Sequence, residues 1–269
     1  MATGFRSVAG IAVIAIVAGC QTGALPSPSA PSQSATSPTH APSTVPATPA
    51  PTQGLPLGAE PVTLDPADFV AGVDHPFWPM RPGSRWVYSE TDLDGSVLRV
   101  EVTVLPETRT ILGITATVVH DIVTEDGAVV EDTIDWYAQD RAGNLWYLGE
   151  KTAEYEAGVV TSTAGSWEAG VGGAQPGVIL PGSITVGTTY RQEYLAGEAE
   201  DAGAIVSLDE WVEVAAGRYA GVLLTRDYTA LHPEILEHKF YAPGVGPILI
   251  LGISGGTSRE ALISLEPGP

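Results

Sequence analysis

The feature that most constrains the fold is a two-residue alternation of apolar and polar side chains. Between Leu98 and Val104 every second residue is Leu or Val, and the residues between them are Arg, Glu and Thr. Successive side chains of a β-strand point to opposite faces, so this period indicates a strand with one buried face. We find no convincing helical stripe over about ten residues or more, and the pattern therefore predicts an all-β protein.

Further strand-like runs follow along the chain, separated by turn signals. They are 110–124, 129–138, 145–149, 188–195, 205–214, 219–228, 235–241, 247–253 and 258–265. Asp94-Gly95 and Asp126-Gly127 lie between alternating segments and are typical of tight hairpins. Strands joined by short turns pair most simply antiparallel. We expect an antiparallel meander that forms a strongly curved sheet, a half-barrel or a barrel, with a β-sandwich as the alternative.

The N-terminus carries the features of an export signal. Arg6 precedes an apolar stretch from Val8 to Ala18, which is too short to span a bilayer but suits a signal peptide. The following Val17-Ala18-Gly19-Cys20 resembles the bacterial lipobox, which implies cleavage before the cysteine and lipidation of its thiol. We therefore predict a lipoprotein signal peptide at 1–19 and a lipid anchor at Cys20. An ordinary signal peptide with a coincidental cysteine is the alternative.

The next forty or so residues have a different composition from the rest. From Gln21 to Ala59 the chain is rich in Pro, Ser, Thr and Ala and carries no acidic or basic residue except His40. Such a segment buries too little apolar surface to offset its chain entropy. We predict a disordered linker at 20–60, plain or glycosylated, and a single all-β ectodomain at 61–269. The expected location is outside the cytoplasm, attached to the membrane of the cell envelope through the lipid.

The charge of the chain is strongly negative. There are 12 basic and 32 acidic residues, a formal net charge of -20, and every acidic residue lies from Glu60 onward. Nucleic-acid binding through phosphate contacts needs a basic surface, so that class is excluded. The single cysteine excludes an intramolecular disulfide framework and Cys-rich metal sites. We expect the carboxylates to crowd the surface of the ectodomain.

One acidic segment is a candidate cation site. Glu193, Glu198, Glu200 and Asp201 lie close together around a glycine. Calcium takes six to eight oxygen ligands, which such carboxylates supply. The spacing is not that of an EF-hand loop, and a solvated acidic loop is the alternative.

Histidine and aromatic residues on the expected strands are candidate ligand-binding residues. His120 and His238 share their strand phase with apolar neighbours, which fits either a zinc or copper site or hydrogen-bonded core residues. Trp136, Trp146 and Tyr190 belong to a set of aromatic side chains on strands. One aromatic face fills the core, and the other is either a platform for flat ligands or covered as well.

Two stretches resemble a known group of proteins. His75-Pro-Phe-Trp-Pro-Met-Arg-Pro-Gly-Ser-Arg-Trp-Val-Tyr88 resembles the opening of many uncharacterised bacterial envelope lipoproteins, and Tyr241-Ala-Pro-Gly-Val-Gly246 is similar to their closing strand. The resemblance implies a curved antiparallel sheet of the LolA/LprG type. It assigns no functional residues, and this chain departs from the lipoprotein carriers in lacking evident helices over the concave face.

These observations favour a binding protein. We expect a small or apolar ligand, or an envelope partner, to bind in the concavity of the curved sheet. The alternatives are a cation-binding protein or hydrolase with a carboxylate and histidine site, and a structural component of the envelope. Gly252-Ile-Ser254-Gly-Gly256 matches the nucleophile-elbow pattern, but no Asp or His follows it, so we read it as a turn and assign no catalytic residue.

Overall fold

A computed structural model describes residues 54–91 and 95–269. The predicted signal peptide, Cys20 and most of the predicted linker lie outside these residues. Within the described part of the chain, no helix has the length and apolarity needed to cross a membrane. The described helical structure is a three-residue 3₁₀ turn at Pro66–Asp68, capped by the Asp65 side chain.

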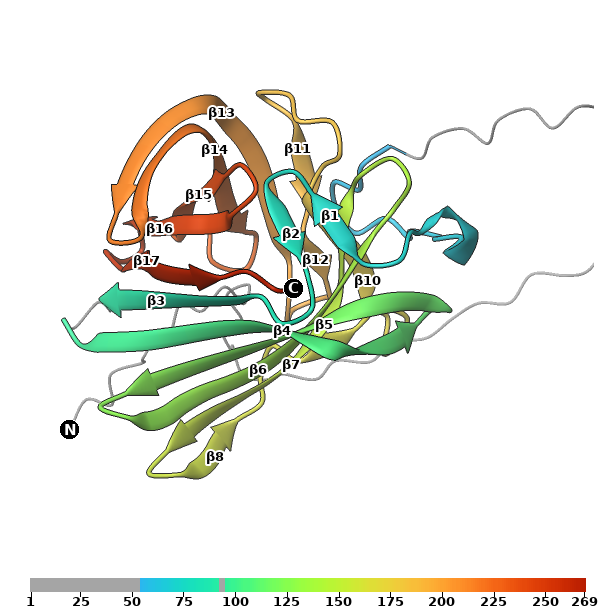
Figure 1. Cartoon of the computed structure of the whole chain (residues 1–269). Coiled ribbons are helices and arrows are strands. Elements are labelled where there is room, and N and C mark those ends of the chain that lie inside the picture. The colour runs from blue at the N-terminus through green and yellow to red at the C-terminus, as the bar shows by residue number, and fades with distance from the viewer. Residues whose placement is uncertain (1–53, 92–94) are drawn as a thin grey trace, which may run out of the picture. The chain divides into compact units, whose positions relative to one another are not determined.

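One large antiparallel sheet accounts for most of the described chain (Figure 1). A separate hairpin of β1 (Val73–His75) and β2 (Trp78–Met80) precedes it. The sheet contains β3 (Arg85–Thr91), β4 (Val97–Ile111), β5 (Ile114–Glu125), β6 (Ala128–Gln139), β7 (Leu145–Glu156), β8 (Val159–Ser162), β9 (Trp167–Glu168), β10 (Gln175–Leu180), β11 (Thr189–Arg191), β12 (Glu193–Tyr194), β13 (Asp201–Val214), β14 (Gly217–Thr229), β15 (Leu236–Ala242), β16 (Gly246–Ser254) and β17 (Arg259–Glu266).

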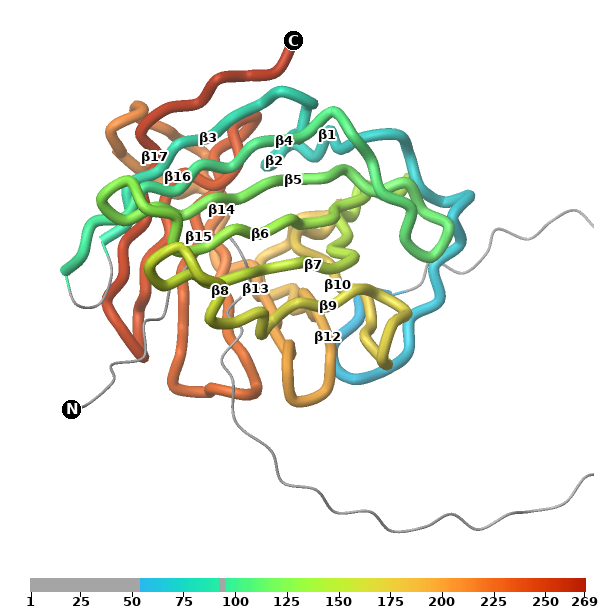
Figure 2. Tube along the Cα trace, turned by 90° about the horizontal axis from the view of Figure 1, so that it is seen from below, coloured from blue at the N-terminus to red at the C-terminus, as the bar shows by residue number. Residues whose placement is uncertain are grey.

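The strand order shows how the sheet curves round on itself. The path runs β11-β13-β14-β15-β16-β17-β3-β4-β5-β6-β7-β10-β12, and β8 and β9 pair with β7. Figure 2 shows β3 to β7 lying side by side across the same wall. The two ends of the path, β11 and β12, are joined in the chain by Gln192 but are not paired. The prediction of one strongly curved antiparallel sheet is confirmed, and the sandwich alternative does not occur.

The hairpin after β5 has the expected turn geometry. Asp126 and Gly127 both have positive φ, 49° and 83°, as in the turns that fit the twist of paired strands. The glycine-rich segment at 252–256 begins in the last three residues of β16 and continues into the loop at 255–258, which leads to the adjacent β17. Ser254 there donates a hydrogen bond to the Glu234 carbonyl over 2.7 Å. The segment thus leads from one strand to the next as expected, but its first three residues, including Ser254, belong to β16.

The unpaired seam between β11 and β12 is covered by residues 55–62, which we call the strap. Arg191 donates from its backbone to Pro56 over 2.6 Å and from its guanidinium to the Glu60 carbonyl over 2.9 Å. The same guanidinium donates to Pro176 of β10 over 2.8 Å. Gly177 has no Cβ, which allows the seam to close, because a Cβ there would lie 2.1 Å from the Gln192 oxygen.

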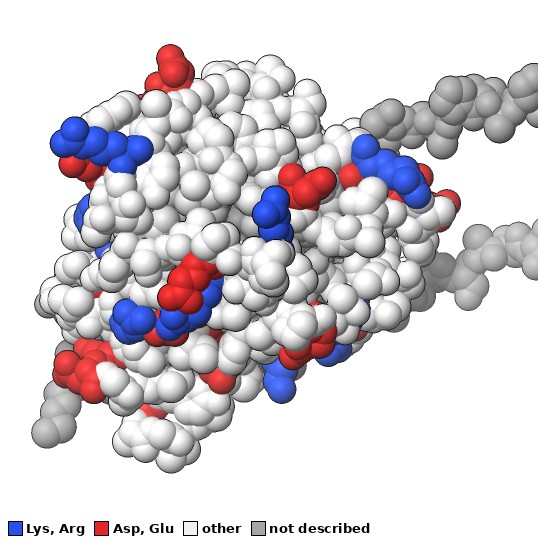
Figure 3. All heavy atoms as spheres, viewed as in Figure 1, with Lys and Arg blue, Asp and Glu red and all other residues white. Residues whose placement is uncertain are grey.

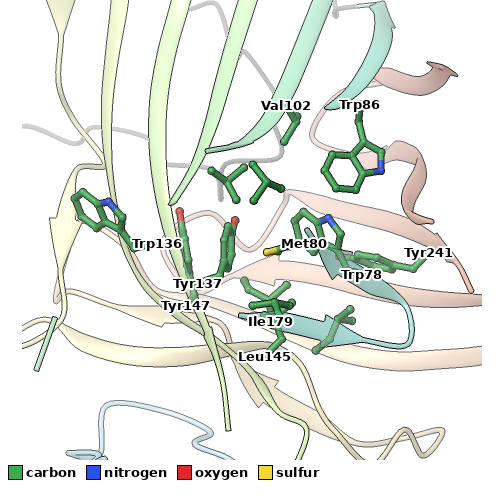
Figure 4. Packing of buried hydrophobic residues seen from close by; sticks show 14 of the residues in the cluster. Trp78, Met80, Trp86, Val102, Trp136, Tyr137, Leu145, Tyr147, Ile179 and Tyr241 are labelled. Carbon is green, nitrogen blue, oxygen red and sulfur yellow. The ribbon is translucent and has the colours of Figure 1, made fainter. Parts of the chain in front are cut away.

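The β1–β2 hairpin inserts Trp78 among aromatic side chains of the curved sheet (Figure 4). The Trp78 ring lies 5.5 Å from that of Tyr137 and 6.1 Å from that of Tyr241. Tyr137 stacks on Tyr147 at 4.9 Å. All four side chains are buried. The hairpin therefore serves as a plug that completes the apolar core.

The two stretches that resemble envelope lipoproteins meet in this half of the molecule. Trp86 donates its indole hydrogen to the Val245 carbonyl over 2.7 Å, and Tyr88 donates to Pro247 over 3.0 Å. Gly246 allows the close approach, because a Cβ at this position would lie 2.7 Å from the Trp78 ring. The resemblance is thus carried by residues that pack against one another and fix the plug.

Candidate functional site: an acidic interior

Another part of the interior is lined by carboxyl groups, and we call it the acidic interior. Ten Asp and Glu side chains among the described residues are buried, and they come from strands around the whole sheet. They are Glu90, Asp121, Glu131, Asp135, Glu150, Glu193, Asp201, Asp227, Glu237 and Glu260. On β6, for example, Glu131 and Asp135 share their phase with the buried Tyr137. These side chains occupy inward strand positions, which normally hold apolar residues.

The expectation that the carboxylates crowd the surface is therefore wrong for a large group of them. On the face shown in Figure 3, acidic and basic side chains form small scattered groups among uncharged atoms. The composition gives the number of acidic residues but not their positions. In this fold many of them lie at strand positions whose side chains point inward.

Strands β6 and β7 form one wall of the acidic interior. Asp135 lies directly opposite Glu150, and Thr133 opposite Thr152. Opposed residues of an antiparallel pair have Cβ atoms about 4.5–5.5 Å apart, so these carboxyl groups are close neighbours. Tyr147 donates its hydroxyl to Asp135 over 2.6 Å, and the two threonine hydroxyls hydrogen-bond over 2.7 Å. Asp135 is thus partnered.

Three buried carboxyl groups lie on β7, β12 and β13, and we call them the carboxylate trio: Glu150, Glu193 and Asp201. Trp167 donates its indole hydrogen to one oxygen of Glu193 over 2.7 Å. Glu150 Oε2, Glu193 Oε1 and Asp201 Oδ1 are buried and have no hydrogen-bond donor among the described residues. Both carboxyl oxygens of Glu260 on β17 are in the same condition. A buried oxygen of this kind costs about 1–3 kcal/mol or more.

One ammonium group lies within the acidic interior. Lys239 Nζ lies 3.1 Å from Asp227 Oδ2 and 3.9 Å from Glu237 Oε2, and all three side chains are buried. Asp227 also accepts hydrogen bonds from Thr225 and Gln192. A cavity of about 10 Å³, room for one water molecule, lies against these residues and Asp201.

Burial raises the pKa of most of these carboxyl groups, because the charged form loses its hydration. The pKa of Glu131, Asp135 and Asp201 rises to about 7 in each case. The pKa values of Glu150 and Glu193 are raised well above the ordinary range, by burial and then by neighbouring carboxylates. Glu193 and Asp201 are among the neighbours that raise the pKa of Glu150, and Asp201 is among those that raise the pKa of Glu193.

The structure separates the residues of the predicted cation site. Glu193 and Asp201 face the interior, whereas Glu198 is exposed and Glu200 accepts a hydrogen bond from the Gly197 backbone over 2.8 Å. Tyr190, one of the predicted ligand-binding residues, also lies inside, with a buried hydroxyl that lacks a described partner. No group of three or more His, Cys, Asp or Glu among the described residues is placed to hold a metal ion.

The two candidate histidines lie in the opposite strand phase from the interior carboxyl groups. His120 Nε2 lies 2.9 Å from Asp132 Oδ1, and the His120 side chain is 28% exposed. On β5 the neighbours Val119 and Asp121 are buried instead. His238 is half-buried on the other face of β15 from Lys239. The interpretation of both histidines as core-facing is therefore wrong, because the apolar residues in their phase cover the outer side of the sheet.

The two candidate tryptophans also lie away from the acidic interior. In Figure 4 the Trp136 ring points away from Tyr137 and the plug. The guanidinium of Arg109 lies 4.2 Å from the centre of the Trp136 ring. Trp146 donates its indole hydrogen to Asp140 over 2.8 Å. Both indoles are buried, so neither forms an exposed platform.

Most residues of the acidic interior were not among the candidates from sequence. The spacing along the strand nevertheless indicates the inward direction of several of them: Glu131, Asp135, Glu150, Glu237 and Lys239. Each lies two residues from an inward-facing neighbour of the same strand, as in Glu131-x-Thr133-x-Asp135-x-Tyr137 and Glu237-x-Lys239-x-Tyr241. An ionisable residue an even number of positions from aromatic core residues of the same strand points into the interior, and several such residues indicate a polar interior.

Comparisons with known proteins give a loose likeness of fold. No protein-family model matches the chain, and no curated protein matches it. A predicted exported protein with a YmcC-like fold from Bacteroides fragilis has 12% identity and a TM-score of 0.43, over 72% of this chain and 100% of that one. A predicted lipoprotein from Parabacteroides distasonis has 14% identity and a TM-score of 0.40, over 71% and 98%. Arguments about function therefore rest on this chain's own residues.

Proposed function

We propose that this chain is a lipid-anchored protein of the cell envelope whose β-domain, outside the cytoplasm, binds a small cationic ligand in its acidic interior. The observation that carries the binding role is the carboxylate trio with its buried, unpartnered oxygens. The signal-like N-terminus and the lipobox-like sequence before Cys20 support the anchor and the location.

The balance of charge inside the sheet determines which class of ligand suits it. Ten buried carboxyl groups face inward, and Lys239 supplies an ammonium among them. Buried carboxylates are unfavourable unless donors or opposite charges compensate them. A cation that brings hydrogen-bond donors supplies both. An apolar ligand would leave the trio uncompensated, so we favour a cationic ligand over the apolar one expected from the sequence.

Access to the interior requires the strap to move. The cavity at Asp201 holds only a water-sized group. The seam between β11 and β12 is the place where two neighbouring strands are not paired, and the strap covers it through Arg191. Opening here breaks hydrogen bonds of Arg191 and of Gln192, whose backbone N–H donates to the Asp201 carbonyl over 2.7 Å, and it leaves the paired strands in place. The seam is therefore the proposed entrance.

The lipid anchor is tested by the substitution Cys20→Ser. We expect the variant to lose acylation and to leave the membrane fraction or stay unprocessed, because the serine hydroxyl does not replace the thiol as acyl acceptor. Intact-mass measurement of the purified protein and membrane fractionation provide the readouts. An unchanged mass, apart from the substitution itself, together with unchanged partitioning would contradict the anchor.

The binding role is tested by calorimetric titration of the purified full-length protein at pH 7. The probes are Ca²⁺, tetramethylammonium and n-butylammonium chlorides at matched ionic strength. We expect saturable binding of at least one cation with release of protons, because a bound cation favours the charged form of carboxyl groups whose pKa is raised. Proton release appears as a heat that depends on the ionisation enthalpy of the buffer.

A triple variant, Glu150→Gln, Glu193→Gln and Asp201→Asn, is the matched control for this titration. It keeps the shape of the site and removes its ionisable groups. We expect the saturable binding and the proton release to disappear together in the variant. Absence of binding by every probe in the wild-type protein would contradict the proposed function.

A further inference from the structure

An amine and two carboxyl groups lie in contact on two neighbouring strands, β14 and β15. In the register of these strands Thr225 lies opposite Lys239, and Asp227 lies opposite Glu237. All four side chains are buried. Lys239 Nζ lies 3.1 Å from Asp227 Oδ2 and 3.9 Å from Glu237 Oε2. These are the groups from which an amide bond between two side chains is made.

The buried ion pair of Lys239 and Asp227 is the reactant state for such a bond. Burial by itself lowers the pKa of Lys239, but the carboxylates of Asp227 and Glu237 outweigh burial and raise it, so the pair starts in its charged form. Removing two charges from water is unfavourable, whereas an amide carries no charge. Well-oriented groups held in contact reach effective concentrations of about 10⁵–10⁸ M, which offsets the small share of free amine.

We propose that Lys239 and Asp227 form an intramolecular isopeptide bond that joins β14 to β15. This modification is separate from the cation binding of the proposed function. It removes one positive and one negative charge together, so the excess of carboxyl groups in the acidic interior stays the same.

The bond forms from these side chains alone. A proton passes from Lys239 Nζ to Asp227 Oδ2, and the lone pair of the resulting amine attacks Asp227 Cγ. Glu237 takes a second proton from Nζ and delivers it to Oδ2, which leaves as water while the carbonyl at Oδ1 forms again. The Nζ–Cγ bond replaces the Cγ–Oδ2 bond, and the by-product is one water molecule.

Two neutral donors hold the carboxyl group that is attacked. The Thr225 hydroxyl donates to Asp227 Oδ1 over 2.9 Å, at the oxygen where negative charge develops during the attack. The side-chain amide of Gln192 donates to Oδ2, the leaving oxygen, over 3.1 Å. Asp227 is therefore held in place on both of its oxygens.

The surroundings also suit the proton transfer and the release of water. Burial raises the pKa of Glu237, which makes its carboxylate a better proton acceptor. Its distance of 3.9 Å from Nζ has to shorten, as contacts of this kind often do when a reaction proceeds. A cavity of about 10 Å³ lies against Asp227, Glu237 and Lys239 and has room for the water that leaves.

Trypsin digestion of the denatured full-length protein, followed by mass spectrometry, tests the bond. Trypsin cleaves after lysine and arginine, which here are Arg226, Lys239 and Arg259. An amide at the Lys239 side chain prevents cleavage after this residue. We therefore expect one peptide of residues 227–259 that is lighter than its sequence by the mass of one water molecule. Its fragmentation should give no ions from backbone cleavage between Asp227 and Lys239.

Lys239→Arg is the matched control, because a guanidinium keeps the charge and the trypsin site but does not attack a carboxyl group. This variant should release residues 227–239 at full mass. Glu237→Gln keeps the shape of the side chain but accepts no proton. In this variant we expect the bond to form at least roughly tenfold more slowly, measured as the cross-linked fraction against time after a pulse of synthesis.

Release of residues 227–239 at full mass from the wild-type protein would overturn the isopeptide bond. A loss of water together with normal cleavage after Lys239 would overturn it as well, because the water would then come from a dehydrated aspartate. An unchanged rate in Glu237→Gln would overturn the role given to Glu237. None of these results depends on whether the interior binds a cation, so the proposed function is tested separately.

Discussion

Substitution of Lys239 by methionine is expected to lower the free energy of unfolding by about 3–5 kcal/mol at pH 8. Methionine preserves most of the buried aliphatic stem but removes the ammonium group that lies 3.1 Å from Asp227 and 3.9 Å from Glu237. Two buried carboxyl groups then lose their counter-charge. Chemical denaturation followed by tryptophan fluorescence measures the change. At pH 5 we expect a smaller loss, because Glu237, whose pKa burial raises, takes up a proton more readily there.

Lys151→Met is the control for this experiment. The chain has two lysines, and Lys151 lies exposed on β7. Exposed substitutions of this kind usually change stability by no more than about 0.5 kcal/mol. Equal effects of the two substitutions at pH 8 would show that Lys239 does not compensate buried charge.

The second large effect is an inverted dependence of stability on pH between about pH 5 and pH 8. Glu131, Asp135 and Asp201 have folded-state pKa values of about 7, above their unfolded values. Between the two values the folded state binds more protons than the unfolded state, so stability falls as the pH rises. One pKa unit corresponds to about 1.4 kcal/mol, which makes each group's contribution on the order of 3 kcal/mol. We expect a melting temperature about 10 °C higher at pH 5 than at pH 8.

Neutral substitutions separate this effect from general repulsion between surface charges. Glu131→Gln and Asp201→Asn remove the ionisation and keep the size of the side chain. Each should raise the melting temperature at pH 8 and flatten the pH profile. Glu198→Gln, at an exposed position, should leave the slope of the profile unchanged. A melting temperature that rises from pH 5 to pH 8 in the wild-type protein would contradict the arrangement of buried carboxyl groups.

The unfavourable carboxylates of the interior are the basis of the proposed binding role. Buried unpartnered oxygens at Glu150, Glu193, Asp201 and Glu260 reduce stability without benefit to packing. Groups whose pKa is strongly shifted by burial and by one another are concentrated at functional sites in proteins. A ligand that compensates them also stabilises the fold, by an amount that grows with its concentration.

The sequence by itself determined the class of fold and the positions of most strands. Alternation from Leu98 to Val104 and turn dipeptides such as Asp126-Gly127 depend on local geometry, since side-chain direction and turn type follow from a few consecutive residues. The sequence also pointed to two segments that pack around the plug. Trp86 and Val245 belong to the two stretches that resemble other proteins, and they are hydrogen-bonded to each other here.

The tertiary structure decided which face of each strand is inside. On β5 both phases contain apolar residues, so Val118 and Val119 are both buried and the pattern alone does not place His120 or Asp121. The carboxylate trio, likewise, joins residues from β7, β12 and β13 that lie near one another only because the sheet curves until its two ends meet. Curvature and closure depend on contacts between residues distant in the chain, such as Gly177 with Gln192 and Arg191 with the strap. A local period of two contains no information about such contacts, and for this reason the fold class was predictable while the interior site was not.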